Sequence, residues 1–240
     1  MNDPVDTIDL ETSAPAMSLQ GFLLLLAATA AGAFLATLVL PYWLPGLSAS
    51  LQGDSPKVFW LISRSCAVVA YILLWLSMVF GLLITNKLAR MWPGGSLAFN
   101  LHQHFSLLGL AFGLFHGLIL MGDQYLQFSL RQVLLPFASA NYRPFWVGLG
   151  QLTFYLMCLV VLSFYIRRRI STRMWRSIHF LSFIVYGMAL LHGIYSGTDA
   201  GAVWARDIYL GSAGLLLFLF NYRILMAMTK SRSKVVKQPA

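Results

Sequence analysis

The stretches 101-LHQHFSLLGLAFGLFHGLILM-121 and 176-RSIHFLSFIVYGMALLHGIYSG-197 decide the fold. Each is long and apolar enough to cross a bilayer, which takes about 20 residues in a helix. A histidine lies near both ends of each stretch: His102 and His116 in the first, His179 and His192 in the second. Because ionisable side chains are costly inside a membrane, these histidines are candidates for a functional site.

Helix geometry places the two histidines of each stretch in opposite leaflets. His102 and His116 are 14 positions apart, which gives roughly 21 Å of rise and an offset of about 40° around the helix. His179 and His192 are 13 positions apart, which gives roughly 20 Å of rise but an offset of about 140°. The depths therefore match between the two helices, while the azimuths match less well.

Two helices with imidazoles at matching depths can hold two flat ligands stacked across the membrane. A haem iron with two axial histidines fits this pattern, because the protein supplies the axial ligands. Zinc fits less well, because a tetrahedral site needs several ligands at one depth. The chain has no C-x-x-C-H motif, so we expect two noncovalent b-type haems. Hydrogen bonding between helices is the alternative role for the four histidines.

Haem propionates need cationic partners, and two arginines are candidates. Arg64 falls within an apolar span and Arg176 one turn before His179, and guanidinium groups bind carboxylates in a bidentate manner. Snorkelling to the membrane surface is the alternative for Arg64. A positive charge that anchors the span is the alternative for Arg176.

The composition is that of a polytopic membrane protein. Of 240 residues, 58% are hydrophobic and 10% are charged, and the mean hydropathy is +0.71, which excludes an ordinary soluble domain. The net charge is +9, but the cationic residues flank apolar spans, so we expect no nucleic-acid partner. Cys66 and Cys158 fall within spans and are expected to be buried, inert thiols.

We predict an all-α membrane protein, a bundle of six transmembrane helices in the region 19–228. The spans are expected at residues 19–40, 58–84, 96–121, 145–166, 177–195 and 208–228. The first should stop at Pro41, and a short interfacial helix is expected within 128–137. The polar, acidic residues 1–18 are predicted to be a disordered cytoplasmic tail, and residues 229–240 a basic cytoplasmic tail.

Cationic residues are distributed unevenly between the two ends of this bundle. One end would carry Lys87, Arg90, Arg167, Arg168, Arg169, Arg173, Arg176, Arg223, Lys230, Arg232, Lys234 and Lys237; the other would carry only Lys57, Arg64, Arg131, Arg143 and Arg206. The positive-inside rule then predicts that both termini are cytoplasmic. His102 and His179 would form an inner pair and His116 and His192 an outer pair, which together make a path for electrons.

Other polar and aromatic residues are weaker candidates. His104 lies about 120° from the face of His116, which predicts a group at the cytoplasmic edge, with inner ligation as the alternative. Arg143 is a weaker candidate for the outer propionates. The aromatic residues that could line the space between the haems, or simply pack, are Phe112, Phe115, Phe183 and Tyr186. The arginines before His179 could dock a cytosolic flavoprotein or contact anionic lipid.

The four histidines at these two spacings resemble the ferric reductase-like transmembrane domain, which ferric reductases share with the membrane part of NADPH oxidases. The flanking residues are also similar: Trp175 and Arg176 before His179, the His192-Gly193 pair, and the run LLPFASANYRPFWVGLG at 134–150. The resemblance covers the chain from about Arg64 to Tyr222.

The resemblance implies electron transfer from a cytosolic reductant, through two haems that these four histidines ligate, to an acceptor on the outer face. Full-length members continue into FAD- and NADPH-binding domains, but no G-x-G-x-x-G follows a strand here. We therefore expect FAD or NADPH to act only through a partner, such as a cytosolic flavoprotein reductase, or a quinol to donate the electrons.

Two alternative functions remain open at this stage. A small relative is the haem-binding membrane subunit of the bacterial periplasmic methionine sulfoxide reductase system, so this chain could be a subunit that serves a separate redox enzyme. That comparison also suggests a multi-pass protein of the bacterial inner (plasma) membrane. The other alternative is a transporter whose histidines relay protons.

Overall fold

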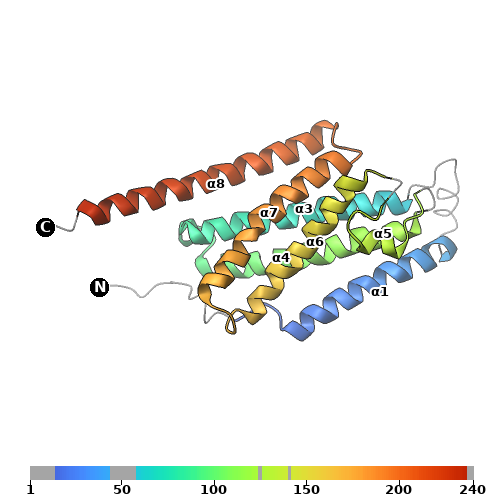
Figure 1. Cartoon of the computed structure of the whole chain (residues 1–240), viewed down its shortest axis with the longest axis horizontal. Coiled ribbons are helices and arrows are strands. Elements are labelled where there is room, and N and C mark those ends of the chain that lie inside the picture. The colour runs from blue at the N-terminus through green and yellow to red at the C-terminus, as the bar shows by residue number, and fades with distance from the viewer. Residues whose placement is uncertain (1–13, 44–57, 124–125, 140–141, 237–240) are drawn as a thin grey trace.

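The computed structural model describes residues 14–43, 58–123, 126–139 and 142–236, without the side chains of Trp43 and of residues 230–236. Within these ranges the secondary structure is entirely helical (Figure 1). The elements are α1 (Leu19–Trp43), α3 (Val58–Thr85), η1 (Leu88–Arg90), α4 (Gly95–Ile119), η2 (Leu120–Gly122), α5 (Leu130–Leu134), α6 (Pro144–Ile166), α7 (Thr172–Ser196) and α8 (Val203–Val236).

Six of these helices, α1, α3, α4, α6, α7 and α8, are long and apolar enough to cross a membrane. Their outward faces expose large apolar side chains, for example Leu24 at 69% and Phe218 at 64%. Such surfaces are rare on soluble proteins and fit a lipid environment. The prediction of an all-α chain with six apolar spans is therefore confirmed.

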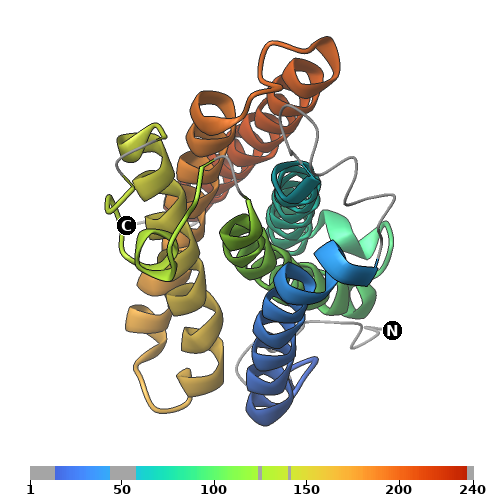
Figure 2. The same cartoon turned by 90° about the vertical axis from the view of Figure 1, so that its right-hand side faces the viewer.

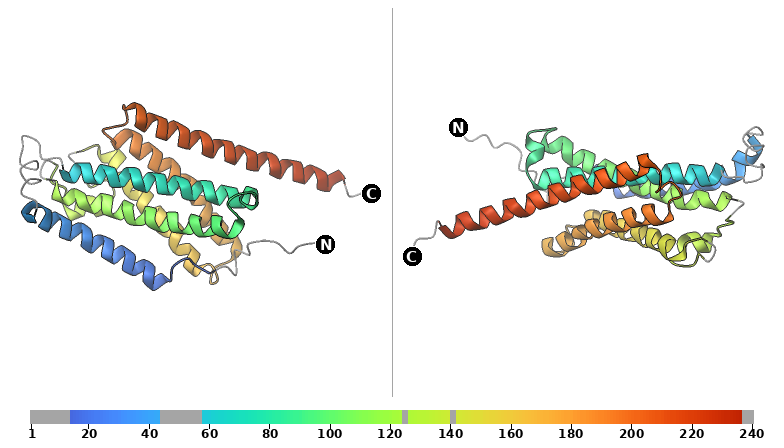
Figure 3. Two further views of the ribbon diagram at one scale, coloured as in Figure 1. Left: turned by 180° about the vertical axis from the view of Figure 1, so that it is seen from behind. Right: turned by 90° about the horizontal axis from the view of Figure 1, so that it is seen from above.

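The long helices lie in two layers, and the central helix α4 contacts helices of both layers. The helix α3 packs along α4, α1 lies against the other side of α4, and α6 packs along α7. Viewed from one end, α3 and α4 lie on one side and α6 and α7 on the other (Figure 2). The α6–α7 pair crosses the α3–α4 pair obliquely, and α8 extends past the bundle (Figures 1 and 3).

Several helix boundaries differ from those predicted. Helix α1 continues past Pro41 to Trp43, because a proline near the end of a helix removes only one backbone hydrogen bond. Helix α7 begins at Thr172, before the predicted span, and the Ser171 side chain caps it by accepting a hydrogen bond from the Met174 N–H. Helix α8 continues through residues 229–236 of the predicted basic tail.

The ends of the chain lie only partly within the described residues. Residues 1–13 of the predicted disordered tail and residues 237–240 of the basic tail lie outside them. Just before α1, the Ala16 backbone N–H donates to the Gln103 side chain of α4, and the Tyr165 hydroxyl of α6 donates to the Met17 carbonyl. These contacts fix residues 16–17 against the end of the bundle that carries His102.

A short helix forms within the predicted stretch 128–137. Ser129 and Gln132 form a capping box at the start of α5. The Gln151 side chain of α6 donates to the carbonyls of Gln132 and Val133. This contact holds α5 against the N-terminal part of α6.

Buried polar side chains meet in the middle of the bundle. The Tyr71 hydroxyl lies 3.0 Å from the Tyr186 hydroxyl and 2.6 Å from Ser212 Oγ. Tyr71 lies between Ser63 and Ser77 along α3, and Tyr186 lies between His179 and His192 along α7. This hydrogen-bonded cluster of Tyr71, Tyr186 and Ser212 joins α3, α7 and α8 at mid-depth.

Candidate metal or cofactor sites between α4 and α7

The structure brings the four predicted histidines together in the two predicted pairs. The ring centroids of His102 and His179 are 5.9 Å apart, with an interplanar angle of 68°. Those of His116 and His192 are 6.2 Å apart, with an angle of 70°. Helix α4 supplies one ring of each pair and α7 the other, so the pairs lie roughly 21 Å apart along α4.

The predicted offset of about 140° between His179 and His192 does not prevent this pairing. Because α7 crosses α4 obliquely (Figure 1), different faces of α7 approach α4 on the two sides of the crossing. Each histidine of α7 thus reaches its partner from a different side of the helix.

The two histidines of α4 are held by two serines of α3. His102 Nδ1 lies 2.8 Å from the Ser77 carbonyl, and His116 Nδ1 lies 2.9 Å from the Ser63 carbonyl. The hydroxyl groups of the same serines lie 3.0 Å and 2.7 Å from these nitrogens. Each hydroxyl also donates to the backbone carbonyl of its histidine.

His192 of α7 is held in the same way by α6. Its Nδ1 lies 2.8 Å from the Trp146 carbonyl. Because a carbonyl only accepts hydrogen bonds, this contact requires a proton on Nδ1. In His102, His116 and His192 the proton therefore lies on Nδ1, and Nε2 keeps its lone pair for a ligand.

His179 contacts a different kind of neighbour. Its ring lies 5.5 Å from the Trp175 ring, one turn earlier on α7, at an interplanar angle of 32°. Trp175 is buried, and within the described part of the chain its indole N–H has no hydrogen-bond partner. Buried donors usually have partners, so this N–H is available to an acceptor of a bound group beside the inner pair.

The geometry of both pairs fits two imidazoles on opposite sides of one metal ion. A metal–imidazole bond is about 2 Å long and the ring nitrogen lies roughly 1 Å from the ring centre, so the centroids should be about 6 Å apart. The observed separations of 5.9 and 6.2 Å agree with this distance. A histidine that binds a metal through one ring nitrogen usually donates a hydrogen bond from the other nitrogen to a carbonyl or carboxylate, as His102, His116 and His192 do. Among the described residues, no three His, Cys, Asp or Glu side chains gather into a metal cluster.

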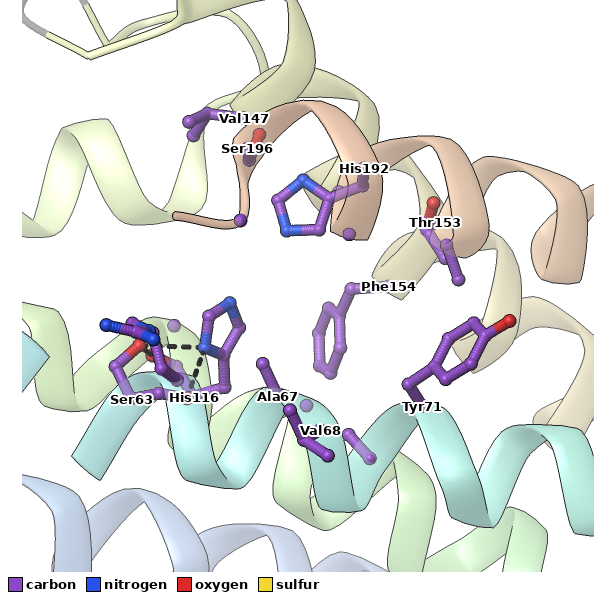
Figure 4. A pocket seen from close by; sticks show the side chains of 18 of the residues that line it. Ser63, Ala67, Val68, Tyr71, His116, Val147, Thr153, Phe154, His192 and Ser196 are labelled. Atoms are coloured by element: carbon purple, nitrogen blue, oxygen red, sulfur yellow. Dashed lines mark hydrogen bonds between the residues drawn. The ribbon is translucent and has the colours of Figure 1, made fainter. Parts of the chain in front are cut away.

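A cavity of about 270 Å³ surrounds the outer pair. Figure 4 shows the rings of His116 and His192 facing each other across it, with Phe154 and Tyr71 beside them. The lining is mostly apolar and extends to both sides of the pair, toward α8 on one side and α5 on the other. Such a cavity suits a flat, apolar ligand.

Arg64 and Asp199 both line this cavity. They form an ion pair, with 27% and 36% of their side chains exposed. The sequence predicted a haem propionate as the partner of Arg64, whereas the carboxylate that Arg64 contacts in the structure is that of Asp199 in the α7–α8 loop. Arg176, by contrast, is exposed near the start of α7.

The segment before α6 binds the end of α7. The Arg143 guanidinium donates to the Tyr195 carbonyl, and the Tyr142 hydroxyl donates to the Ser196 carbonyl at 2.7 Å. Burial raises the pKa of Tyr142 although Arg143 and Arg64 act in the opposite direction, so its hydroxyl stays protonated and able to donate. These bonds satisfy carbonyls at the helix end and support the position of His192.

The remaining candidates lie apart from the paired rings. His104 is exposed and its Nδ1 bonds to the Asn100 carbonyl of its own helix, so it takes no part in the inner pair. Tyr186 belongs to the hydrogen-bonded cluster at mid-depth. Cys66 and Cys158 are free and partly buried.

Sequence reasoning missed the residues that hold the histidines. Ser63 and Ser77 of α3 are 14 positions apart, the same spacing as His102 and His116. In two antiparallel helices such equal spacings place both pairs in contact. This repeated spacing is the signal that would have identified them; the Trp146 carbonyl left no side-chain signal.

The comparisons with known proteins found no matching family model, curated protein or solved structure. The functional conclusion therefore rests on the residues of this chain and their arrangement.

Proposed function

We propose that this chain is a membrane di-haem cytochrome b of the ferric reductase-like type. It transfers electrons across the bilayer from a cytosolic donor to an acceptor at the outer face. The observation that carries this proposal is the pair of facing imidazole couples at two depths, with centroids 5.9 and 6.2 Å apart. At these separations the two imidazoles of each pair would both be able to hold the iron of one haem, which would supply redox chemistry there.

The residues present fit two b-type haems. His102 and His179 would hold the inner haem, and His116 and His192 the outer one. The haems would supply reversible one-electron chemistry. The chain supplies rings with fixed Nδ1 protons, an apolar cavity around the outer pair, and cationic or N–H groups for carboxylates. Arg64 serves the outer site, and Trp175 and Arg176 serve the inner one.

The distribution of charge supports an orientation. Helix α1 begins, and α8 ends, at the end of the bundle near His102 and His179 (Figure 1). Exposed cations gather at this end: Lys87, Arg90, Arg168, Arg169, Arg173 and Arg176. By the positive-inside rule this end is cytoplasmic, and both termini with it. The bacterial inner membrane is the proposed location.

The electron donor is proposed to be a separate molecule, either a flavoprotein reductase or a quinol. A dinucleotide-binding unit needs a parallel sheet, and the described ranges contain helices only. A haem-binding subunit of a larger redox enzyme is the second candidate. It is favoured by the exposed arginines beside the inner pair, which suit an acidic protein surface.

Electron transfer across sealed vesicles tests the function. The purified chain is reconstituted into liposomes that contain ferricyanide, and dithionite is added outside. Reduction of the trapped ferricyanide should be faster than in empty liposomes, and His179→Ala and His116→Ala should each return it to that background. Equal rates in all vesicles would contradict the proposal. If the purified protein also lacked Soret absorption, proton relay by the histidines would replace it.

A further inference from the structure

Three of the four paired histidines bond to a carbonyl inside a neighbouring helix. The acceptors are the carbonyls of Ser77 and Ser63 in α3 and of Trp146 in α6. In an α-helix each such carbonyl already accepts the N–H of the residue four positions later. A second donor must therefore approach from the side, past the side chain of that later residue.

The residue at this later position is small in all three cases. It is Gly81 after Ser77, Ala67 after Ser63, and Gly150 after Trp146. Glycine is a poor helix former, so helix stability does not explain why glycine occupies these two positions inside α3 and α6. The space that the absent side chains leave for an imidazole explains both glycines.

Close approach of the imidazoles supports this explanation. A Cβ on Gly150 would lie 2.5 Å from His192 Nδ1 and 2.6 Å from its Cε1. A Cβ on Gly81 would lie 3.3 Å from His102 Cε1. The added Cβ at Gly150 would therefore clash with the His192 ring. The added Cβ at Gly81 would require only a small shift of the His102 ring. Ala67 lines the cavity beside His116 (Figure 4), where a methyl group fits.

We propose that Gly81, Ala67 and Gly150 are positioning residues for the redox centres: each opens a helical carbonyl to one histidine. This inference rests on the proposed function and deepens it. The bond to the carbonyl holds the proton on Nδ1 and aims Nε2 at the partner ring across the site. A larger residue at any of the three positions shifts the imidazole relative to the carbonyl and to the bound group, and the shift is largest where the added atoms would clash with the ring.

The glycine of α6 gives the sharpest test, and α7 offers a matched control. Gly150→Ala should displace His192, so the purified protein should keep about half of its haem, and one of two low-spin ferric signals in electron paramagnetic resonance should be lost. Gly187→Ala, where an added Cβ meets nothing within 4 Å, should keep both signals. Gly81→Ala should shift the g values of the inner signal without loss of haem. Wild-type spectra in Gly150→Ala would overturn the proposal.

A second measurement does not depend on a new variant or on haem content. Nitrogen-15 NMR of histidine-labelled protein in bilayers reports which ring nitrogen carries the proton, in the dithionite-reduced or the haem-free state. His102, His116 and His192 should be protonated at Nδ1. Protonation at Nε2 in these three residues would overturn the positioning role, whether Gly150→Ala folds or not. Absence of haem with Nδ1 protonation intact would instead contradict the proposed function alone.

Discussion

Arg64 of α3 forms an ion pair with Asp199 of the α7–α8 loop, and both side chains line the cavity that contains His116 and His192. Both side chains are partly exposed, so the pair contributes little to folding stability by itself. Its position matters more, because the guanidinium lines the cavity in which a carboxylate of the proposed outer cofactor would lie.

Replacement of Arg64 should therefore weaken the outer site. Arg64→Gln should raise the rate of haem loss from the outer site several-fold, corresponding to about 1 kcal/mol, while Asp199→Asn frees the guanidinium and should slow that loss. Haem transfer to apomyoglobin, followed by absorption, measures both rates. Arg206→Gln is the control, because that guanidinium is exposed and does not line the cavity. Unchanged loss from Arg64→Gln would show that Arg64 binds only Asp199.

Each histidine pair should lose its haem independently. His116→Ala and His192→Ala should each remove the outer haem and leave the inner one reducible, because the pairs lie at opposite ends of α4. His104→Ala should retain both, since that ring is exposed and bonded to its own helix. Reduced-minus-oxidised spectra measure the remaining haem. Two haems in His116→Ala would contradict the assignment of the outer ligands.

The cluster of Tyr71, Tyr186 and Ser212 should stabilise the bundle. Tyr71→Phe removes a hydroxyl that bonds to both other members, which should cost about 1 kcal/mol and lower the midpoint of thermal unfolding by on the order of 2–4 °C. Tyr42→Phe, at a side chain that is 85% exposed, should leave the midpoint unchanged. Thermal unfolding in nanodiscs provides the comparison, and equal midpoints would mean that the cluster contributes no net stability.

The purified chain should not oxidise NADPH. NADPH added to the protein in nanodiscs should leave the Soret band in its oxidised position, and a flavoprotein reductase or a quinol should then reduce it. The change in absorption at the reduced α-band gives the rate. Rapid reduction by NADPH alone, in a preparation shown to be free of flavin, would place a nucleotide site within this chain.

The spans and the histidine pairs could be predicted from the sequence because both are local patterns. Long apolar runs predict membrane helices, and the positions of His102 and His116 along one helix fix their depths. The pairing with His179 and His192 followed from matching depths alone. The azimuth of α7 could not be predicted, because it depends on the angle at which α7 crosses α4.

The supporting contacts could not be predicted because they join separate helices through the backbone. The Trp146 carbonyl carries no side-chain signature, and its bond to His192 depends on the register between α6 and α7. The partner of Arg64 depends likewise on the path of the α7–α8 loop, which brings Asp199 to the cavity. Gly150 and Gly81 were visible in the sequence, but their role appears only beside the rings that they accommodate.

The number of haems bound per chain tests the central claim most directly. The purified protein, expressed with ample haem, is assayed as the pyridine haemochrome together with a dithionite-reduced minus oxidised spectrum. The account predicts two b-type haems per chain, with His102, His179, His116 and His192 all required for the full amount. One haem per chain would contradict the proposed two-haem path across the membrane. A protein without bound haem would contradict the whole account.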